Sequence, residues 1–467
     1  MNVLFIQSSI IPQFGIMYLS AVLKSKGHKT KLVREQDAFN AINKFHPGLI
    51  AISLTTGEHK NLLKVAQDIK KEYSIPIIAG GPHATFFPEL IENSYIDFIG
   101  IGECDYALLE LVEAIEKRKD TTKIANIWAK KGKKIIKNMP ANLIADLDKL
   151  PFPDREIYYD DYDFLRYLNL KNFMSGRGCP YNCSFCFNHA MQKLYSGKGN
   201  YIRKRTPENL IAEIMNVREK YPVNYITFTD DTFIIDRIWL KHFCKLYKQR
   251  IAIPFICNIR ANLITEEIVR CLKDAGCFAV SMGIETGNEN IRNSLLRKGI
   301  TDSQILLSGK LIKKYKLKLK TYNMLGYPQE TLEDAFNTLR LNAKLNPDQA
   351  SFAIIQPYPG TEFCRDAIEK GYLSKDYSAD DVPDTLRASS PLKYKNKKEI
   401  ENLLSFAFVC IKFPFLIPLV KILIKLPPNA LYRTLSKAVY GYYMSRFYNL
   451  NIGETIKYAI QSGYKFA

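Results

Sequence analysis

Short apolar runs alternate with amphipathic stretches from Met1 to about Lys119. The runs include NVLFIQ, LIAISL, IPIIAGG and DFIGIGE, and the stretches between them repeat apolar residues at helical spacing. Strands that alternate with helices of ten or more residues predict a parallel sheet covered on both faces. Residues 1–119 are therefore predicted to form a doubly wound α/β domain, whose ligand would lie beyond the carboxyl ends of the strands.

A second alternation of strands and helices runs from residue 164 to residue 380. It holds about six units, too few for the closed eight-unit barrel, and so predicts an open, partial (β/α)6 barrel. Residues 120–163 break the rhythm, and we interpret them as a linker with a hairpin in IWAKKGKKIIKN. Residues 381–467 become apolar and basic, and we expect a mainly helical C-terminal region.

Length and composition are those of a multidomain enzyme. A chain of 467 residues with 47% hydrophobic residues can bury two or three cores. The net charge of +19 favours anionic partners, but the lysines are scattered, so we interpret them mainly as a solvated surface and expect no nucleic-acid partner. Ten cysteines do not form a disulfide scaffold here, and the start lacks a secretory signal, so we expect a cytoplasmic protein with reduced thiols.

The most specific feature is the loop GRGCPYNCSFCFNH, which follows a predicted strand. It holds Cys179, Cys183 and Cys186, close enough for their thiolates to face one iron–sulfur centre. Three protein ligands on a cluster of four irons leave one iron open to another ligand. The alternative is a zinc site completed by His189, although zinc ligands usually come as two separated pairs.

The cysteine spacing and the aromatic Phe185 before the last cysteine resemble the signature loop of the radical S-adenosylmethionine (SAM) enzymes. The resemblance implies a [4Fe-4S] cluster whose open iron binds the amino and carboxylate groups of SAM. Electron transfer would then cleave SAM to a 5′-deoxyadenosyl radical. It further implies a reductant such as flavodoxin or ferredoxin, and it places Phe185 beside the adenine.

Later strand ends of the second domain agree with the same family pattern. The resemblance implies that Asp230 and Asp231 lie near the SAM amino group, Arg260 at its carboxylate and Glu285 at its ribose. Gly326 lies in the segment that resembles the family's fifth strand end. Simpler interpretations stay open: a helix cap for Asp231, a surface position for Arg260, a structural role for Glu285 and turn chemistry for Gly326.

Glycine-containing strand ends in the first domain, ahead of a radical SAM loop, resemble the cobalamin-binding domain of the class B radical SAM enzymes. The Asp-x-His-x-x-Gly motif that supplies a cobalt-ligating histidine is absent, so the cobalt would have no protein histidine below it. The alternative is a flavodoxin-like domain that has lost its ligand. The residues for which the resemblance implies cobalamin contacts are Ser53, Gly80, Gly81, Pro82, His83, Gly102 and Glu103.

The number of cysteines outside the loop limits the subfamilies to which the chain can belong. A tRNA methylthiotransferase would need a second cysteine trio near the start, yet only Cys104 precedes the loop. Cys364 and Cys410 are too few for an auxiliary cluster near the C-terminal end. The subfamilies that need these additional cysteines are therefore excluded, and the other cobalamin-binding subfamilies remain as candidates.

An apolar run of 23 letters, LLSFAFVCIKFPFLIPLVKILIK, is long enough to span a bilayer. Lys412 near its centre would cost about 2.5–3.5 kcal/mol there, and Pro414 and Pro418 interrupt a helix. We therefore expect a helical cap on the barrel, with peripheral membrane contact as a further hypothesis and core packing as its alternative. The basic residues that interleave with tyrosine and phenylalanine further on are Arg433, Lys437 and Arg446.

The reaction that these features favour is methylation of an unactivated carbon, or of a phosphorus centre, in a small-molecule or lipid-like substrate. By resemblance, one SAM methylates reduced cobalamin and a second yields the radical that activates the substrate. A radical cyclisation or oxidative rearrangement without methyl transfer is the first alternative. A noncatalytic cluster-bearing sensor or assembly protein is the alternative from another class.

Overall fold

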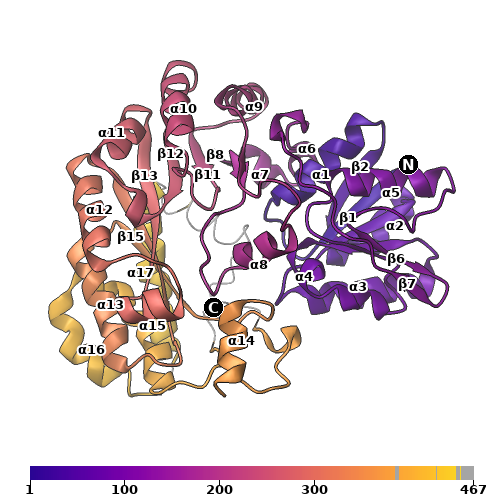
Figure 1. Cartoon of the computed structure of the whole chain (residues 1–467). Coiled ribbons are helices and arrows are strands. Elements are labelled where there is room, and N and C mark those ends of the chain that lie inside the picture. The colour runs from indigo at the N-terminus through magenta and orange to yellow at the C-terminus, as the bar shows by residue number, and fades with distance from the viewer. Residues whose placement is uncertain (384–388, 428, 449–452, 454–467) are drawn as a thin grey trace. The chain divides into compact units, whose positions relative to one another are not determined.

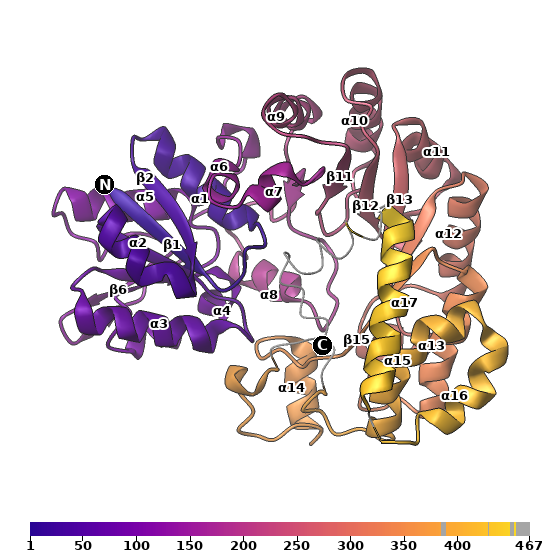
Figure 2. The same cartoon turned by 180° about the vertical axis from the view of Figure 1, so that it is seen from behind.

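The computed structural model describes residues 1–383, 389–427, 429–448 and 453 (Figures 1 and 2). The chain separates into two compact units. The first comprises Met1–Leu168 and Met191–Lys204, and the second comprises Asn169–Ala190 and Arg205–Ala467. The return of residues 191–204 to the first unit differs from the linear division that the sequence pattern predicts, because Tyr195 and Arg203 bond to Glu103 in the segment after the fifth strand of the first unit.

The first unit is built on a seven-stranded sheet in the order β2-β1-β3-β4-β5-β6-β7. Strands β1 to β5 are parallel and confirm the predicted doubly wound domain. The predicted hairpin forms, but it adds to this sheet as an antiparallel edge and is not a free linker. The strands are β1 (Asn2–Gln7), β2 (Lys29–Arg34), β3 (Leu49–Ser53), β4 (Ile77–Gly80), β5 (Phe98–Gly100), β6 (Ile127–Lys131) and β7 (Lys134–Ile136).

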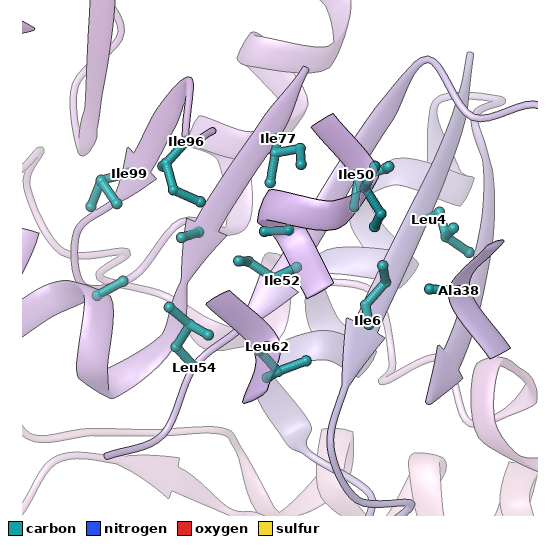
Figure 3. Close-up of a cluster of buried hydrophobic side chains, with 14 of the residues drawn as sticks. Leu4, Ile6, Ala38, Ile50, Ile52, Leu54, Leu62, Ile77, Ile96 and Ile99 are labelled. Atoms are coloured by element: carbon teal, nitrogen blue, oxygen red, sulfur yellow. The ribbon is translucent and has the colours of Figure 1, made fainter. Parts of the chain in front are cut away.

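One face of this sheet packs against α2 (Ala38–Phe45) and α3 (His59–Glu72) through the aliphatic cluster of Figure 3. Leu4 and Ile6 of β1 belong to that cluster, and the alternate residues of the strand are buried on the opposite face. The other helices include α1 (Phe14–Ser25), α4 (Gly81–Phe86), α5 (Asp105–Glu116), α6 (Glu156–Tyr159) and α7 (Asp163–Tyr167), of which α1 and α5 pack against each other.

The second unit confirms the partial barrel. Its six parallel strands lie in the order β15-β14-β13-β12-β11-β8, so the strand nearest the cysteine loop is at one edge. The strands are β8 (Leu170–Phe173), β11 (Tyr225–Phe228), β12 (Phe255–Ile259), β13 (Cys277–Glu285), β14 (Lys318–Leu325) and β15 (Gln349–Ile354).

Helices of the barrel begin at side-chain caps, which explains where each one starts. Each cap oxygen accepts from a backbone N–H of the first turn. The helices and their caps are α9 (Pro207–Lys220, Thr206), α10 (Arg237–Arg250, Asp236), α11 (Glu266–Asp274, Thr265), α12 (Asp302–Lys314, Thr301), α13 (Leu332–Leu345, Thr331) and α14 (Glu362–Glu369, Thr361).

The part of the C-terminal region that the structure describes is mainly helical, as predicted, with α15 (Lys397–Lys412), α16 (Ile417–Leu423) and α17 (Ala430–Tyr448). Helix α15 packs on α13 and β15, and its buried side chains continue the core of that edge. The apolar run breaks before Pro414, as predicted. Across the described residues, no helix combines the length and the apolar character needed to cross a membrane.

Candidate cofactor sites

The three loop cysteines lie in the second unit, after β8. Cys183 is buried, and Cys179 and Cys186 are partly buried. Burial raises the pKa of the Cys179 and Cys186 thiols, and the nearby Cys183 raises each further. All three thiols belong to the same short loop, which keeps their backbone positions close together. A bound metal centre would supply the positive charge that keeps them deprotonated.

Ser184 fixes the cysteine loop in place. Its side-chain hydroxyl donates to the Leu295 carbonyl at 2.6 Å, and its backbone N–H donates to the Leu296 carbonyl at 3.0 Å. Its own carbonyl accepts from Phe363 N–H at 2.9 Å. Because Ser184 is buried, these bonds are shielded from water and hold the loop to the segment after β13 and to the start of α14.

The chemistry of three thiols in one loop suits a cubane cluster with one open iron. Among the described residues, the loop cysteines included, no three His, Cys, Asp or Glu side chains surround a point closely enough for one metal ion. Sulfur ligands of a cubane lie farther apart than those of a single zinc ion, because each binds a different iron. His189, the fourth ligand of the zinc alternative, lies with Nε2 3.1 Å from Glu362 Oε1, which counts against that alternative.

Arg260 lies beside the cysteine loop and not on the surface. Only 8% of it is exposed, and its Nη1 lies 3.8 Å from the sulfur of Cys183. The guanidinium stacks on Tyr181 at 3.6 Å from the ring centroid and donates to the Lys298 carbonyl. Its Nε is buried without a hydrogen-bond partner. A buried cationic donor with unused capacity suits a carboxylate such as that of SAM.

The two aspartates after β11 have different surroundings. Asp230 is buried and accepts from the backbone N–H and the hydroxyl of Ser175, so it holds the chain just before the cysteine loop. Asp231 is exposed and accepts from Asn188 Nδ2 at 3.0 Å, beside Cys186. The helix-cap alternative for Asp231 is wrong, because Asp236 caps α10.

Glu285 stands at the end of β13 in a left-handed backbone conformation, with φ +68°. It is 8% exposed, and its Oε1 accepts from Lys298 Nζ at 2.6 Å. Such a backbone conformation is rare outside glycine and aims the carboxylate in a direction that a regular strand would not. The role of Glu285 at the SAM ribose stays a prediction. Lys298 was not predicted as the partner of Glu285, because a single ion pair leaves no periodic pattern in the sequence.

Buried polar atoms without partners gather after β14 and β15. Gly326 N–H donates to Glu330 Oε2 at 2.6 Å, while Glu330 Oε1 has no partner. The Tyr327 hydroxyl and both amide atoms of Gln356 are likewise buried and unpartnered. Phe185, the aromatic residue of the cysteine loop, packs on the apolar cluster that includes Tyr327. Gln356 was not among the predicted site residues, although a polar residue two positions after the end of β15 was an available signal.

In the first unit, the strand ends bring some of the predicted cobalamin contacts together. Ser53 pairs with Gly80 in the sheet, and its hydroxyl donates to Gln13 Oε1 at 2.8 Å. Gly81 has φ +92°, and a Cβ there would lie 2.8 Å from the Leu54 carbonyl oxygen. Glycine is therefore required at this edge, where Pro82 begins α4.

The other predicted cobalamin contacts are engaged within the protein. His83 is 2% exposed, its Nδ1 lies 2.9 Å from the Thr56 hydroxyl, and its ring stacks on His59 at 3.9 Å between centroids. It therefore lies inside the domain, in agreement with a cobalt that has no histidine below it. The sequence predicts that His83 lies just after a strand end, but it does not predict that the side chain points into the domain. That direction is set by the turn of α4.

Residues 191–204 occupy the space beside Gly102. A Cβ on Gly102, with φ +67°, would lie 2.8 Å from Cζ of Tyr195. The Tyr195 hydroxyl accepts from Glu103 N–H at 2.6 Å, and the Glu103 carboxylate binds Arg203. The approach of Tyr195 is a sufficient reason for a glycine at position 102, and the roles of Gly102 and Glu103 at cobalamin stay predictions.

Comparison with known families matches both units. Residues 8–112 match the B12 binding domain, and residues 173–341 match the radical SAM superfamily. With the cysteine loop and the two folds described above, the chain belongs to the cobalamin-binding radical SAM enzymes. Its cofactors follow from the two domains: a [4Fe-4S] cluster and SAM for the second, and cobalamin for the first.

Curated relatives carry more than one activity. An uncharacterized methyltransferase of Pyrococcus horikoshii is 29% identical over 85% of this chain and 87% of its own length. An anaerobic magnesium-protoporphyrin IX monomethyl ester cyclase of Rubrivivax gelatinosus is 24% identical over 77% of this chain and 67% of its own. Cytidylyl-2-hydroxyethylphosphonate methyltransferase of Streptomyces wedmorensis is 20% identical over 78% and 79%.

Solved structures share the fold at low sequence identity. The cobalamin-dependent SAM radical enzyme OxsB, with aqua-cobalamin and SAM bound, superposes with a TM-score of 0.71 at 16% identity, over 100% of this chain and 73% of its own. The radical SAM methyltransferase TsrM of Kitasatospora setae gives a TM-score of 0.65 at 16% identity, over 79% and 76%. The arrangement of a B12-binding domain followed by a partial barrel is therefore that of known proteins.

Proposed function

We propose that the protein transfers a methyl group from SAM, by way of cobalamin, to an unactivated carbon of a small-molecule or lipid-like substrate, with a phosphorus centre as the second choice. The observation that carries the proposal is the presence in one chain of a B12-binding domain and a three-cysteine radical SAM loop. Two of the relatives named above are methyltransferases, one of them acting on a phosphonate.

The buried polar atoms without partners are the groups that we assign to reactant binding. Arg260 Nε, the Tyr327 hydroxyl and the Gln356 amide lie in the second unit on three different strand ends or the segments after them. Buried polar groups normally have partners, and leaving them without one costs about 1–3 kcal/mol each. SAM or the substrate would supply these partners, with Arg260 at the SAM carboxylate.

When bound, the cluster supplies the electron that cleaves one SAM to methionine and the 5′-deoxyadenosyl radical, and cobalamin carries the methyl group of a second SAM. The substrate loses a hydrogen atom to the adenosyl group and gains the methyl group. Ser184 holds the cysteine loop, and Asp230 holds the chain before it, so the cluster ligands keep their places during turnover. Each turnover would consume two electrons, one for the cleavage of SAM and one to return cobalamin to the reduced state that accepts a methyl group, and we propose a flavodoxin or ferredoxin as their source.

A radical cyclisation without methyl transfer is the second candidate, because a cyclase is also among the relatives. The two functions differ in the fate of the SAM methyl group. Methyl transfer also converts one SAM to S-adenosylhomocysteine for each 5′-deoxyadenosine formed, whereas cyclisation forms 5′-deoxyadenosine alone.

The test uses the full chain, reconstituted without oxygen with iron, sulfide, cobalamin and SAM that carries a trideuterated methyl group. A small-molecule and lipid extract serves as the substrate source, and mass spectrometry follows the label. We expect a product with three deuterium atoms and S-adenosylhomocysteine beside 5′-deoxyadenosine. Formation of 5′-deoxyadenosine with no label in any product or corrinoid would refute methyl transfer and favour cyclisation.

A further inference from the structure

Large apolar side chains are exposed together in one segment after the barrel. Within the described residues, fifteen large hydrophobic side chains are exposed, and six of them fall between residues 413 and 431. Single exposed apolar residues are ordinary, but a contiguous group marks an interaction site. The six are Phe413 (47% exposed), Phe415 (76%), Leu419 (52%), Ile422 (64%), Leu426 (48%) and Leu431 (73%), which we call the apolar face.

Helix α16 is apolar on two sides. Ile417 and Val420 point inward and join the core beneath α15, whereas Leu419 and Ile422 are exposed on the outer side. Figures 1 and 2 both show α16 beside α13 and α15, and among the described residues of the second unit no helix or strand covers its other side. The inner residues account for the folding of this helix, so the outer ones have no role in the core.

A groove continues the apolar face between α15 and α17. Its volume is about 340 Å³, and its walls include Phe408, Phe413, Val439 and Tyr442. Lys412 is the charged residue of its lining and donates to the Pro347 carbonyl at 2.6 Å. An apolar groove with one cationic group is chemically suited to an acyl chain beside an anionic headgroup.

Charge in this part of the chain has one sign. From residue 402 to residue 453 there is no aspartate or glutamate, whereas six basic residues are present. Lys421 pairs with Glu333 at 3.1 Å, whereas Lys425, next to Leu426, and Lys437, six residues after Leu431, are exposed. Exposed apolar residues in a segment whose own charged residues are all basic match the surface of an anionic bilayer, since lipid headgroups attract lysine and acyl chains accept phenylalanine and leucine.

We propose that the apolar face docks the protein on the surface of an anionic lipid membrane, with α16 lying in the headgroup region. A second protein copy would bring the same basic residues together, and their repulsion disfavours that occupant. Docking would give the enzyme access to an apolar substrate, but it does not depend on the reaction proposed above. Each exposed lysine adds roughly fivefold to the affinity at low salt.

The experiment is flotation of the full chain with vesicles of phosphatidylcholine alone or with 30% phosphatidylglycerol, where the percentage is roughly that of an anionic leaflet. We expect flotation with the anionic vesicles only, and loss of it at high salt. The variant Phe415→Ser, Leu419→Ser, Ile422→Ser is expected to weaken binding at least about tenfold. Its matched control is Met139→Ser, Ile238→Ser, Leu307→Ser, which removes three equally exposed side chains elsewhere and is expected to bind like the parent.

A reporter variant keeps the test independent of folding defects. In Phe415→Trp, tryptophan emission is expected to shift to shorter wavelength with anionic vesicles and to be quenched by brominated lipid. Equal flotation of the serine variant and its control would overturn the proposal. So would a dimer in solution that the serine variant abolishes while no vesicle is bound, because a second copy would then cover the face.

Discussion

Replacement of Gly287 by alanine tests the packing that holds Glu285. A Cβ at position 287 would lie 2.5 Å from the carbonyl carbon of Asn337 and from the backbone nitrogen of Thr338, both in α13. Ordinary contacts begin near 3.4 Å, so the segment after β13 and α13 must separate by about 1 Å, and overpacking of this kind costs about 1–3 kcal/mol. Separation also weakens the bond from Gly287 N–H to the Thr338 hydroxyl, 2.8 Å long, which is worth about 1 kcal/mol.

We therefore expect Gly287→Ala to lower the free energy of unfolding of the second unit by about 2–4 kcal/mol. The matched control is Gly441→Ala, in the middle of α17, where a Cβ meets nothing within 4 Å. Alanine is favoured over glycine in a helix, so that variant is expected to gain about 0.5–1 kcal/mol.

Urea unfolding followed by tryptophan fluorescence measures both changes. The chain has two tryptophans, Trp128 in the first unit and Trp239 buried in the second, so a Trp128→Phe background reports on the second unit alone. If Gly287→Ala changes the free energy by less than about 0.5 kcal/mol, the contact between this segment and α13 is not as close as the structure shows.

Two further predictions concern carboxylates. Burial raises the pKa of Glu330 from 4.5 to about 8, so its carboxyl group is protonated in the folded state at neutral pH. Stability that is present below pH 4.5 is then lost as the pH rises towards 8, and Glu330→Gln should flatten this decline in urea titrations at several pH values. Asp236→Ala should lower the melting temperature by removing the α10 cap, worth about 1 kcal/mol, whereas Asp231→Ala should not; equal effects would contradict the assignment of the cap.

The fold was largely predictable because its signal is local. Most strands of both sheets coincide with short runs that are apolar or alternate apolar with polar residues, and the barrel helices follow these runs. The hairpin at β6 and β7 was predicted as a hairpin, but its attachment to β5 was not. Pairing of an edge strand depends on which neighbour is left open in three dimensions, and no local pattern carries that information.

The candidate sites were predictable where chemistry and spacing coincide, as in the three cysteines, and less so where side chains meet from distant segments. Tyr195 and Arg203 come back to Gly102 and Glu103 across about ninety residues of sequence. Their contacts consist of single hydrogen bonds and ion pairs, which leave no periodicity.

The central claim is that Cys179, Cys183 and Cys186 hold a four-iron cluster with one iron open to SAM. The most direct measurement is anaerobic reconstitution with iron and sulfide, followed by metal analysis and electron paramagnetic resonance of the reduced protein with and without SAM. The account predicts about four irons per chain and a spectrum that changes when SAM is added. Alanine at all three positions should abolish both signals, whereas Cys104→Ala with Cys271→Ala, and His189→Ala, should keep them. Uptake of one zinc ion that requires His189, or an unchanged iron content in the triple variant, would contradict it.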